Sequence, residues 1–178
     1  MPGLSFESTL KKSRETEMKK LLLASILSVA SLSAQASNWA YLTVSSDCQK
    51  SFMINVDNDS NKADTAMFWM GIVNIDKKEP HDTQISYVVG DCESYEYTLQ
   101  DTTFYLKGNR IETLKQQTPR ATAKKGTVIH LAIQTVCKDS YDPDRIFEYS
   151  GPKDMAKDAQ RILRELNKEI KKMQGSPF

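Results

Sequence analysis

The chain has 178 residues and a formal net charge of +1, and 39% of its residues are hydrophobic. This length leaves room for one proper core, and the composition is ordinary for a folded protein. Basic and acidic residues are interspersed along the chain, which excludes the basic patch expected of a nucleic-acid-binding protein.

The N-terminal stretch predicts a secretory signal peptide. Met18-Lys19-Lys20 forms a basic start, residues 21–32 form an apolar run, and Ala34-Gln35-Ala36 is a small-x-small cleavage site. The apolar run is too short and too rich in serine for a membrane span. We therefore expect cleavage between Ala36 and Ser37, loss of the polar leader 1–17, and export to the periplasm or beyond. No cysteine follows the apolar run to accept a lipid.

The mature chain then shows a series of short strands. Aromatic and β-branched residues separated by polar turns predict six of them: 38–44, 51–56, 65–75, 83–89, 94–106 and 111–114. The connections are short, and 107–110 is a hairpin signal. Short connections favour an antiparallel meander, because parallel strands would need crossover helices.

The segment 126–137 predicts a helix that covers this sheet. Apolar residues recur there at three- and four-residue steps, and Thr127 is a suitable N-cap. A strand is the alternative, because β-branched residues are frequent in the segment. With the sheet, the helix gives an α+β domain over residues 37–138.

Residues 139–178 are interpreted as a turn-rich linker, 139–150, followed by an amphipathic helix over 151–173. The apolar stripe of this helix is Met155, Ala159, Ile162, Leu163, Leu166, Ile170 and Met173. We expect the helix to be an appendage to a self-sufficient domain, since the repeat is too short to require a coiled coil.

Export gives the three cysteines a structural meaning. Cys92 closes a strand and Cys137 closes the predicted helix, so a disulfide between them would join helix to sheet. Spacing does not fix the connectivity, and Cys48 could replace either partner. With Cys92 bonded to Cys137, Cys48 would be left in a polar turn, where it could link two copies of the chain.

The sequence contains little that indicates catalysis. It has two histidines: His81 lies in a predicted turn, and His130 lies on the covering helix but off its apolar stripe. The series Asp57-x-Asp59-x-Asn61 begins like a calcium loop, but Lys62 and Phe68 occupy its two most demanding positions. The acidic residues 139, 142 and 144 are typical of a solvated turn. We expect no catalytic residue, metal or cofactor.

Aromatic residues are the remaining candidates for a site. Most should fill the sheet face under the helix, but any surplus on the other face would form a binding surface. We take Trp69, Tyr95 and Tyr97 as that candidate surface, with Tyr95 and Tyr97 on one face of their strand.

From Trp39 to Cys137 the chain resembles the bacterial surface-adhesin E family. The matching features, in order, are Trp39, Val56-Asp57 followed by Ser60, Trp69, Asp91-Cys92, Tyr105 before Gly108, and Val136-Cys137. The resemblance implies an antiparallel sheet tied to a helix by a Cys92–Cys137 bridge, and binding of host or extracellular-matrix proteins without catalysis. The chain departs from the family in its missing lipid-bearing cysteine, in Cys48 and in the helix at 151–173.

The expected function is therefore an exported, non-catalytic binding module, with surface adhesion as the form that the resemblance implies. The alternative is a soluble periplasmic inhibitor or accessory protein that binds another envelope protein. Its contacts would be the aromatic face or the terminal helix, and a homodimer through Cys48 or that helix is a further expectation. No nucleic acid and no stable membrane span after signal cleavage are expected.

Overall fold

The computed structural model describes residues 36–175, except 63, 77–78 and 116. The signal peptide and leader predicted for residues 1–36 therefore lie outside the described residues, apart from Ala36. The strands are β1 Ser37–Val44, β2 Lys50–Asn55, β3 Ser60–Lys62, β4 Thr65–Asn74, β5 Thr83–Asp91, β6 Glu96–Leu106, β7 Asn109–Leu114, β8 Ala121–Thr122 and β9 Ile146–Tyr149. The helices are α2 Val128–Cys137, a 3-10 turn η1 Pro143–Arg145, and α3 Pro152–Gly175.

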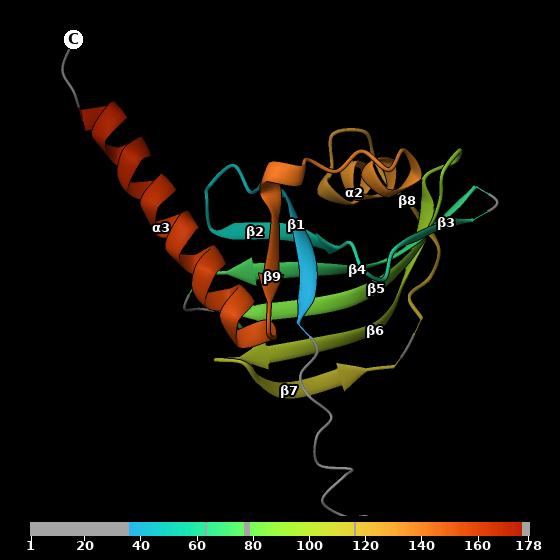
Figure 1. The fold of residues 1–178 in the computed structure, drawn as a ribbon, viewed down its shortest axis with the longest axis horizontal. Helices are drawn as coiled ribbons and strands as arrows, with labels where there is room; N and C mark the ends of the chain where they lie inside the picture. Colours follow the sequence, from blue (N-terminus) through green and yellow to red (C-terminus); the bar gives the residue numbers. More distant parts are fainter. Residues whose placement is uncertain (1–35, 63, 77–78, 116, 176–178) are drawn as a thin grey trace, which may run out of the picture. The chain divides into compact units, whose positions relative to one another are not determined.

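All of these strands form one antiparallel sheet in the order β7-β6-β5-β4-β2-β1-β9, with β3 paired to β4 and β8 to β6 (Figure 1). The predicted α+β class and antiparallel meander are confirmed. The strands β3, β8 and β9 were missed by the sequence analysis because they have only two to four residues each. A segment that short cannot show a convincing alternation.

Alternation along β4 gives the sheet two buried faces. Ala66, Phe68 and Met70 belong to one hydrophobic cluster with residues of α2. Val73 belongs to a second cluster with residues of α3, and Trp69 packs against it. Because neighbouring residues of a strand point to opposite faces, α2 and α3 cover opposite faces of the sheet.

The helix α2 confirms the predicted helix and excludes the strand alternative. The Thr127 side chain accepts a hydrogen bond from the backbone N–H of His130, as an N-cap should. Ala132, Ile133 and Val136 are buried against the sheet. Close approach is possible because Gly90 lies beneath Ile133, where a Cβ atom would come within 2.9 Å of it.

The C-terminal segment is not an appendage, contrary to the expectation from sequence. The strand β9, placed within the predicted linker, pairs with β1. Met155, Ala156, Ala159 and Leu163 of α3 are buried, and the first three form a cluster with Trp39, Met53 and Val73. An apolar stripe predicts that one face of a helix is buried. It does not predict which surface buries that face, which here is the second face of the sheet.

Only the first part of α3 lies on the sheet (Figure 1). Asn167 donates a hydrogen bond to the carbonyl oxygen of Cys48 at 2.9 Å and is the last α3 residue with a recorded bond to the sheet domain. Beyond Leu163 the apolar stripe is exposed: Leu166 is 38% exposed and Met173 is 69% exposed. No helix within the described residues is long and apolar enough to cross a membrane.

Candidate functional site

The disulfide between Cys92 and Cys137 is present, with a Cα–Cα distance of 5.8 Å. It connects the end of β5 to the end of α2, as predicted. Polar residues of the neighbouring loop reinforce this junction. Asn61 donates to the carbonyl oxygen of Cys137 at 2.7 Å, and the Tyr141 hydroxyl donates to the Asp59 carboxylate. The loop that resembled a calcium site is therefore engaged in holding α2 and the segment after it.

The other acidic residues singled out in the sequence also make protein contacts. The Asp57 carboxylate accepts hydrogen bonds from the backbone N–H and the side-chain amide of Asn38, at 2.6 and 2.9 Å. Asp142 caps η1 by accepting from the Asp144 N–H and pairs with Arg145 at 3.2 Å. Within the described residues, no cluster of three or more His, Cys, Asp or Glu side chains is placed to hold a metal ion.

Cys48 differs from the expected exposed turn thiol. Its side chain is buried, with 6% of its surface exposed, and it forms no disulfide. It lies in a tight turn with φ of 51°, and its carbonyl oxygen is bonded to Asn167 of α3. A disulfide-linked dimer through Cys48 would require this turn to leave its packing against the helix.

Both histidines rest on aromatic rings. The imidazole of His130 stacks on Tyr95, with ring centroids 4.2 Å apart and an interplanar angle of 17°, and His81 lies 4.7 Å from the ring of Phe104. Neither imidazole ring has a hydrogen bond to the described part of the chain, although the backbone of each histidine does. His130 and Cys137 lie on the same helix, but Cys137 is bonded to Cys92 and so offers His130 no free thiol to activate.

The structure divides the predicted aromatic surface between the two faces of the sheet. Trp69 packs on the α3 side, where it meets Tyr87 with ring centroids 5.0 Å apart. Tyr95 and Tyr97 pack instead against the cluster under α2. The sequence analysis placed Tyr95 in a strand with Tyr97. Instead, Tyr95 precedes β6 and has a φ of 56°, which is not a strand conformation. The pairing of Trp69 with Tyr87 was not predicted, because cross-strand register cannot be read from one sequence.

A group of hydroxyls is buried between β1, β2, β9 and α3. The Tyr149 hydroxyl donates to Asp158 of α3 at 3.0 Å. The hydroxyls of Tyr41 and Ser51 are buried and have no hydrogen-bond partner within the described residues. Burial raises the pKa of Tyr41 to about 12, and burial with the nearby Tyr41 and Asp158 raises the pKa of Tyr149.

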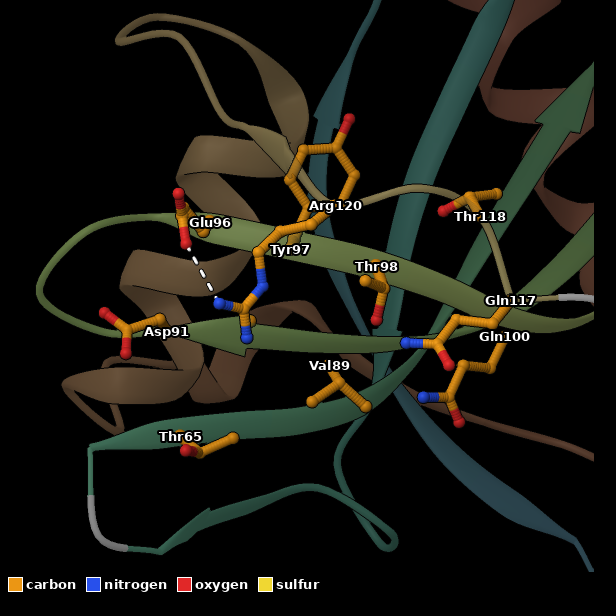
Figure 2. Close-up of a pocket in the computed structure, with 11 residues that line it drawn as sticks. Thr65, Val89, Asp91, Glu96, Tyr97, Thr98, Gln100, Gln117, Thr118 and Arg120 are labelled. Atoms are coloured by element: carbon orange, nitrogen blue, oxygen red, sulfur yellow. Dashed lines mark hydrogen bonds and ion pairs between the residues drawn. The ribbon is translucent and has the colours of Figure 1, made fainter.

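The candidate site is a cleft of about 240 Å³ formed by β4, β5, β6 and the segment 117–120 (Figure 2). Val89 and Thr98 line the floor, and Gln100 and Gln117 reach into it from one end. At the other end Arg120 crosses the opening and pairs with Glu96 at 3.2 Å. Tyr97, a candidate residue from the sequence, also lines the cleft. The other residues were not predicted, because no motif connects them.

The charges at this end are already engaged by protein groups. The Asp91 carboxylate accepts hydrogen bonds from the backbone N–H and the hydroxyl of Ser94 and from the N–H of Glu93. These bonds hold the pKa of Asp91 below its usual range, so Asp91 is ionised at neutral pH. The arrangement offers hydrogen bonds and an apolar floor to a ligand.

Comparison of the chain with protein-family models, characterised proteins and solved structures finds no match. The resemblance to the adhesin E family therefore rests on the residues quoted for it, and function has to be argued from the site and surfaces.

Proposed function

We propose that the protein is an exported, non-catalytic binding module that docks on another protein through the outer half of α3, residues 164–173. Two features support export: the signal peptide predicted before Ser37, and the Cys92–Cys137 bridge, since disulfides persist in oxidising compartments. The docking function is argued from the exposed apolar face of the outer half of α3.

This outer half exposes an apolar stripe that the sheet does not cover. Leu166 and Met173 are exposed and Ile170 is partly exposed, at the spacing that places them on one helix face. Exposed apolar stripes on helices are typical of segments that lie in the groove of a partner protein. Single exposed apolar residues are ordinary, but three in register on a projecting helix are not.

Charge defines the kind of groove that would fit. The acidic residues of this helix are engaged: Asp158 and Glu165 pair with Arg161, and Glu169 pairs with Lys172. In contrast, Arg164, Lys168 and Lys171 form no ion pair within the described residues. The partner is therefore a protein with an apolar groove flanked by carboxylates.

Two forms of this function differ in the partner. The resemblance implies a surface adhesin that binds host or extracellular-matrix proteins. The projecting helix favours the second form, a soluble periplasmic accessory or inhibitory protein that binds another envelope protein, because a single helix suits a pre-formed groove better than a fibrous matrix protein.

A photocrosslinking experiment tests the docking surface. The intact protein carries a photoreactive phenylalanine at position 170, and a control carries it at exposed position 157 on the part of α3 that covers the sheet. Both are irradiated with an envelope extract and, separately, with immobilised laminin and fibronectin. We expect an adduct from position 170 and none from position 157.

The supporting result also requires competition. Unlabelled wild-type protein should abolish the adduct, whereas a Leu166→Glu, Ile170→Glu double variant should not, and Lys157→Glu should behave as wild type. An adduct with an envelope protein selects the accessory form, and one with a matrix protein selects the adhesin form. Equal labelling from 157 and 170, or equal competition by the double variant, would contradict docking through α3.

A further inference from the structure

The cleft between β5, β6 and residues 117–120 contains hydrogen-bonding groups that the fold does not use. The Thr98 side chain is only 8% exposed and points into the cleft, yet its hydroxyl has no hydrogen-bond partner within the described residues. The hydroxyl is still open to solvent on the cleft side, and the rest of the residue is enclosed. A hydrogen bond to this hydroxyl therefore has to come from water or a ligand in the cleft.

Two side-chain amides, of the half-buried Gln100 and the exposed Gln117, also line the cleft without a partner among the described residues. The side chains of Gln100 and Gln117 point into the cleft from the end opposite Arg120 (Figure 2). Neither amide has a recorded hydrogen bond to any described residue. Each offers two N–H donors and one carbonyl acceptor, so with Thr98 the cleft presents donors and acceptors in close alternation. Val89 adds an apolar patch to the floor.

The charge at the cleft excludes an anionic ligand. Asp91 and Glu96 contribute two carboxylates, and Arg120 contributes one guanidinium group, which is already paired with Glu96. The local balance is therefore negative, and a phosphate or carboxylate would be repelled. The fitting ligand is uncharged and carries groups that both donate and accept hydrogen bonds.

An extended peptide does not fit the backbone at this place. The edge of β6 beside the cleft is occupied, because the Leu99 N–H donates to the Thr118 hydroxyl and the Thr118 N–H donates to the Leu99 carbonyl, both at 2.9 Å. The next residues of β6 pair with β8. Within the described residues, these contacts leave no long run of unpaired β6 backbone beside the cleft to which a peptide could add as a strand.

We propose that this cleft is a carbohydrate-binding site that takes one neutral sugar ring. Neighbouring hydroxyls of a pyranose would bond to the amides of Gln100 and Gln117 and to Thr98, and the C–H face of the ring would lie on Val89. The cleft is smaller than the roughly 300–1,000 Å³ of pockets for drug-sized ligands, which fits one ring and not an oligosaccharide. This inference goes beyond the protein-docking function and does not rest on it.

Backbone amide shifts of the intact ¹⁵N-labelled protein test this site. The probes are the methyl glycosides of glucose, galactose, mannose and N-acetylglucosamine, each titrated to high millimolar concentration. At least one should give saturable shifts confined to Thr98, Gln100, Thr118 and Arg120 and their neighbours. A Gln100→Ala, Gln117→Ala variant loses both amides, so its Kd for that glycoside should be about tenfold or more above the wild-type value.

Two further variants separate binding from folding. Thr98→Val keeps the shape of the floor and removes the hydroxyl, so it should weaken binding while the spectrum stays that of a folded protein. Gln134→Ala, on α2 and away from the cleft, should leave the Kd unchanged.

Absence of saturable shifts with all four glycosides would overturn the proposal. So would binding that is equally strong in wild type and in the Gln100, Gln117 variant. If the peptide Ala-Ser-Ala-Ser-Ala shifts these amides and the glycosides do not, the cleft is a peptide site and the carbohydrate proposal is wrong.

Discussion

The two helices cover opposite faces of the same sheet, but they are attached in different ways. The helix α2 has ten residues, with a cap at Thr127 and a disulfide at Cys137. The helix α3 has 24 residues, no covalent tie, and leaves the sheet after Asn167. It is held by the packing of Met155, Ala159 and Leu163, which are almost completely buried.

This difference shows two routes to fixing a helix on a sheet. A helix as short as α2 is marginal by itself, and the disulfide restricts the unfolded chain in its favour. The longer α3 buries enough apolar surface to stay in place without a bond, and its length leaves a second half for another task. The following experiments test whether the two attachments work as described.

Removing α3 and β9 should have the largest effect. A chain ending at Ser140 loses the edge strand beside β1 and exposes the second cluster around Trp39, Met53 and Val73. The free energy lost should match or exceed the roughly 5–15 kcal/mol by which a domain is stable. We expect no cooperative transition in thermal unfolding followed by circular dichroism.

The matched control is a chain that ends at Asn167. It keeps every fully buried residue of α3 and removes only the outer half, so its melting temperature should stay close to that of the intact protein. A cooperative fold in the chain ending at Ser140 would show that α3 is an appendage after all.

Breaking the covalent attachment should come next. Cys92→Ser and Cys137→Ser open a loop between residues 45 positions apart, for which the chain-entropy model gives about 4 kcal/mol. The two variants should lower the melting temperature by similar amounts, and the double variant by little more. Cys48→Ser should cost much less. If the two single variants lowered the melting temperature by clearly different amounts, loss of the disulfide would not be the common cause of their destabilisation.

Within α3, two leucines three residues apart should differ sharply. Leu163 is fully buried, so Leu163→Ala should lower the free energy of unfolding by about 3 kcal/mol. Leu166 lies on the outer half and is exposed, so Leu166→Ala should change it by about 0.5 kcal/mol or less. Urea denaturation of both variants measures the difference, and equal losses would place both residues in the core.

The smallest effect concerns the hydroxyl of Tyr41 between the sheet and α3. Its pKa in the folded protein, about 12, lies above the value near 10 of an unfolded chain. Between these values the unfolded chain loses its proton first, so this tyrosine's contribution to stability is complete below about pH 10 and is lost as the pH rises towards 12. Tyr41→Phe should make the fall in melting temperature above pH 10 shallower.

The same variant should change stability little at neutral pH, because the hydroxyl has no hydrogen-bond partner among the described residues. Thermal melts of wild type and variant at matched pH values give the comparison. An identical fall in both proteins would show that Tyr41 does not titrate in this range.

Local patterns were enough to predict α2 and the meander. The spacing of Ile129, Ile133 and Val136 marks a helix, Thr127 marks its start, and short polar turns imply antiparallel neighbours. The Cys92–Cys137 pairing followed from the position of each cysteine at the end of an element. These features depend on residues close together in the sequence.

Features that depend on long-range register were not predictable. The strand β9 has four residues, and its identity depends on pairing with β1, more than a hundred residues away. The stripe of α3 was recognised, but nothing local indicates that its first half is core and its second half is free. Likewise, Thr98 and Gln100 become candidate ligand-binding residues only because the sheet places them beside residues 117–120.

The division of α3 at Asn167 is the central claim, and hydrogen exchange of the intact protein measures it most directly. We expect the backbone amides of residues 155–163 to exchange as slowly as those of β4 and β5, because they are released only by global unfolding. Amides of residues 168–173 should exchange much faster, through fraying of the outer half. If residues 155–163 exchanged as fast as residues 168–173, α3 would not be part of the core, and the account of both its halves would be wrong.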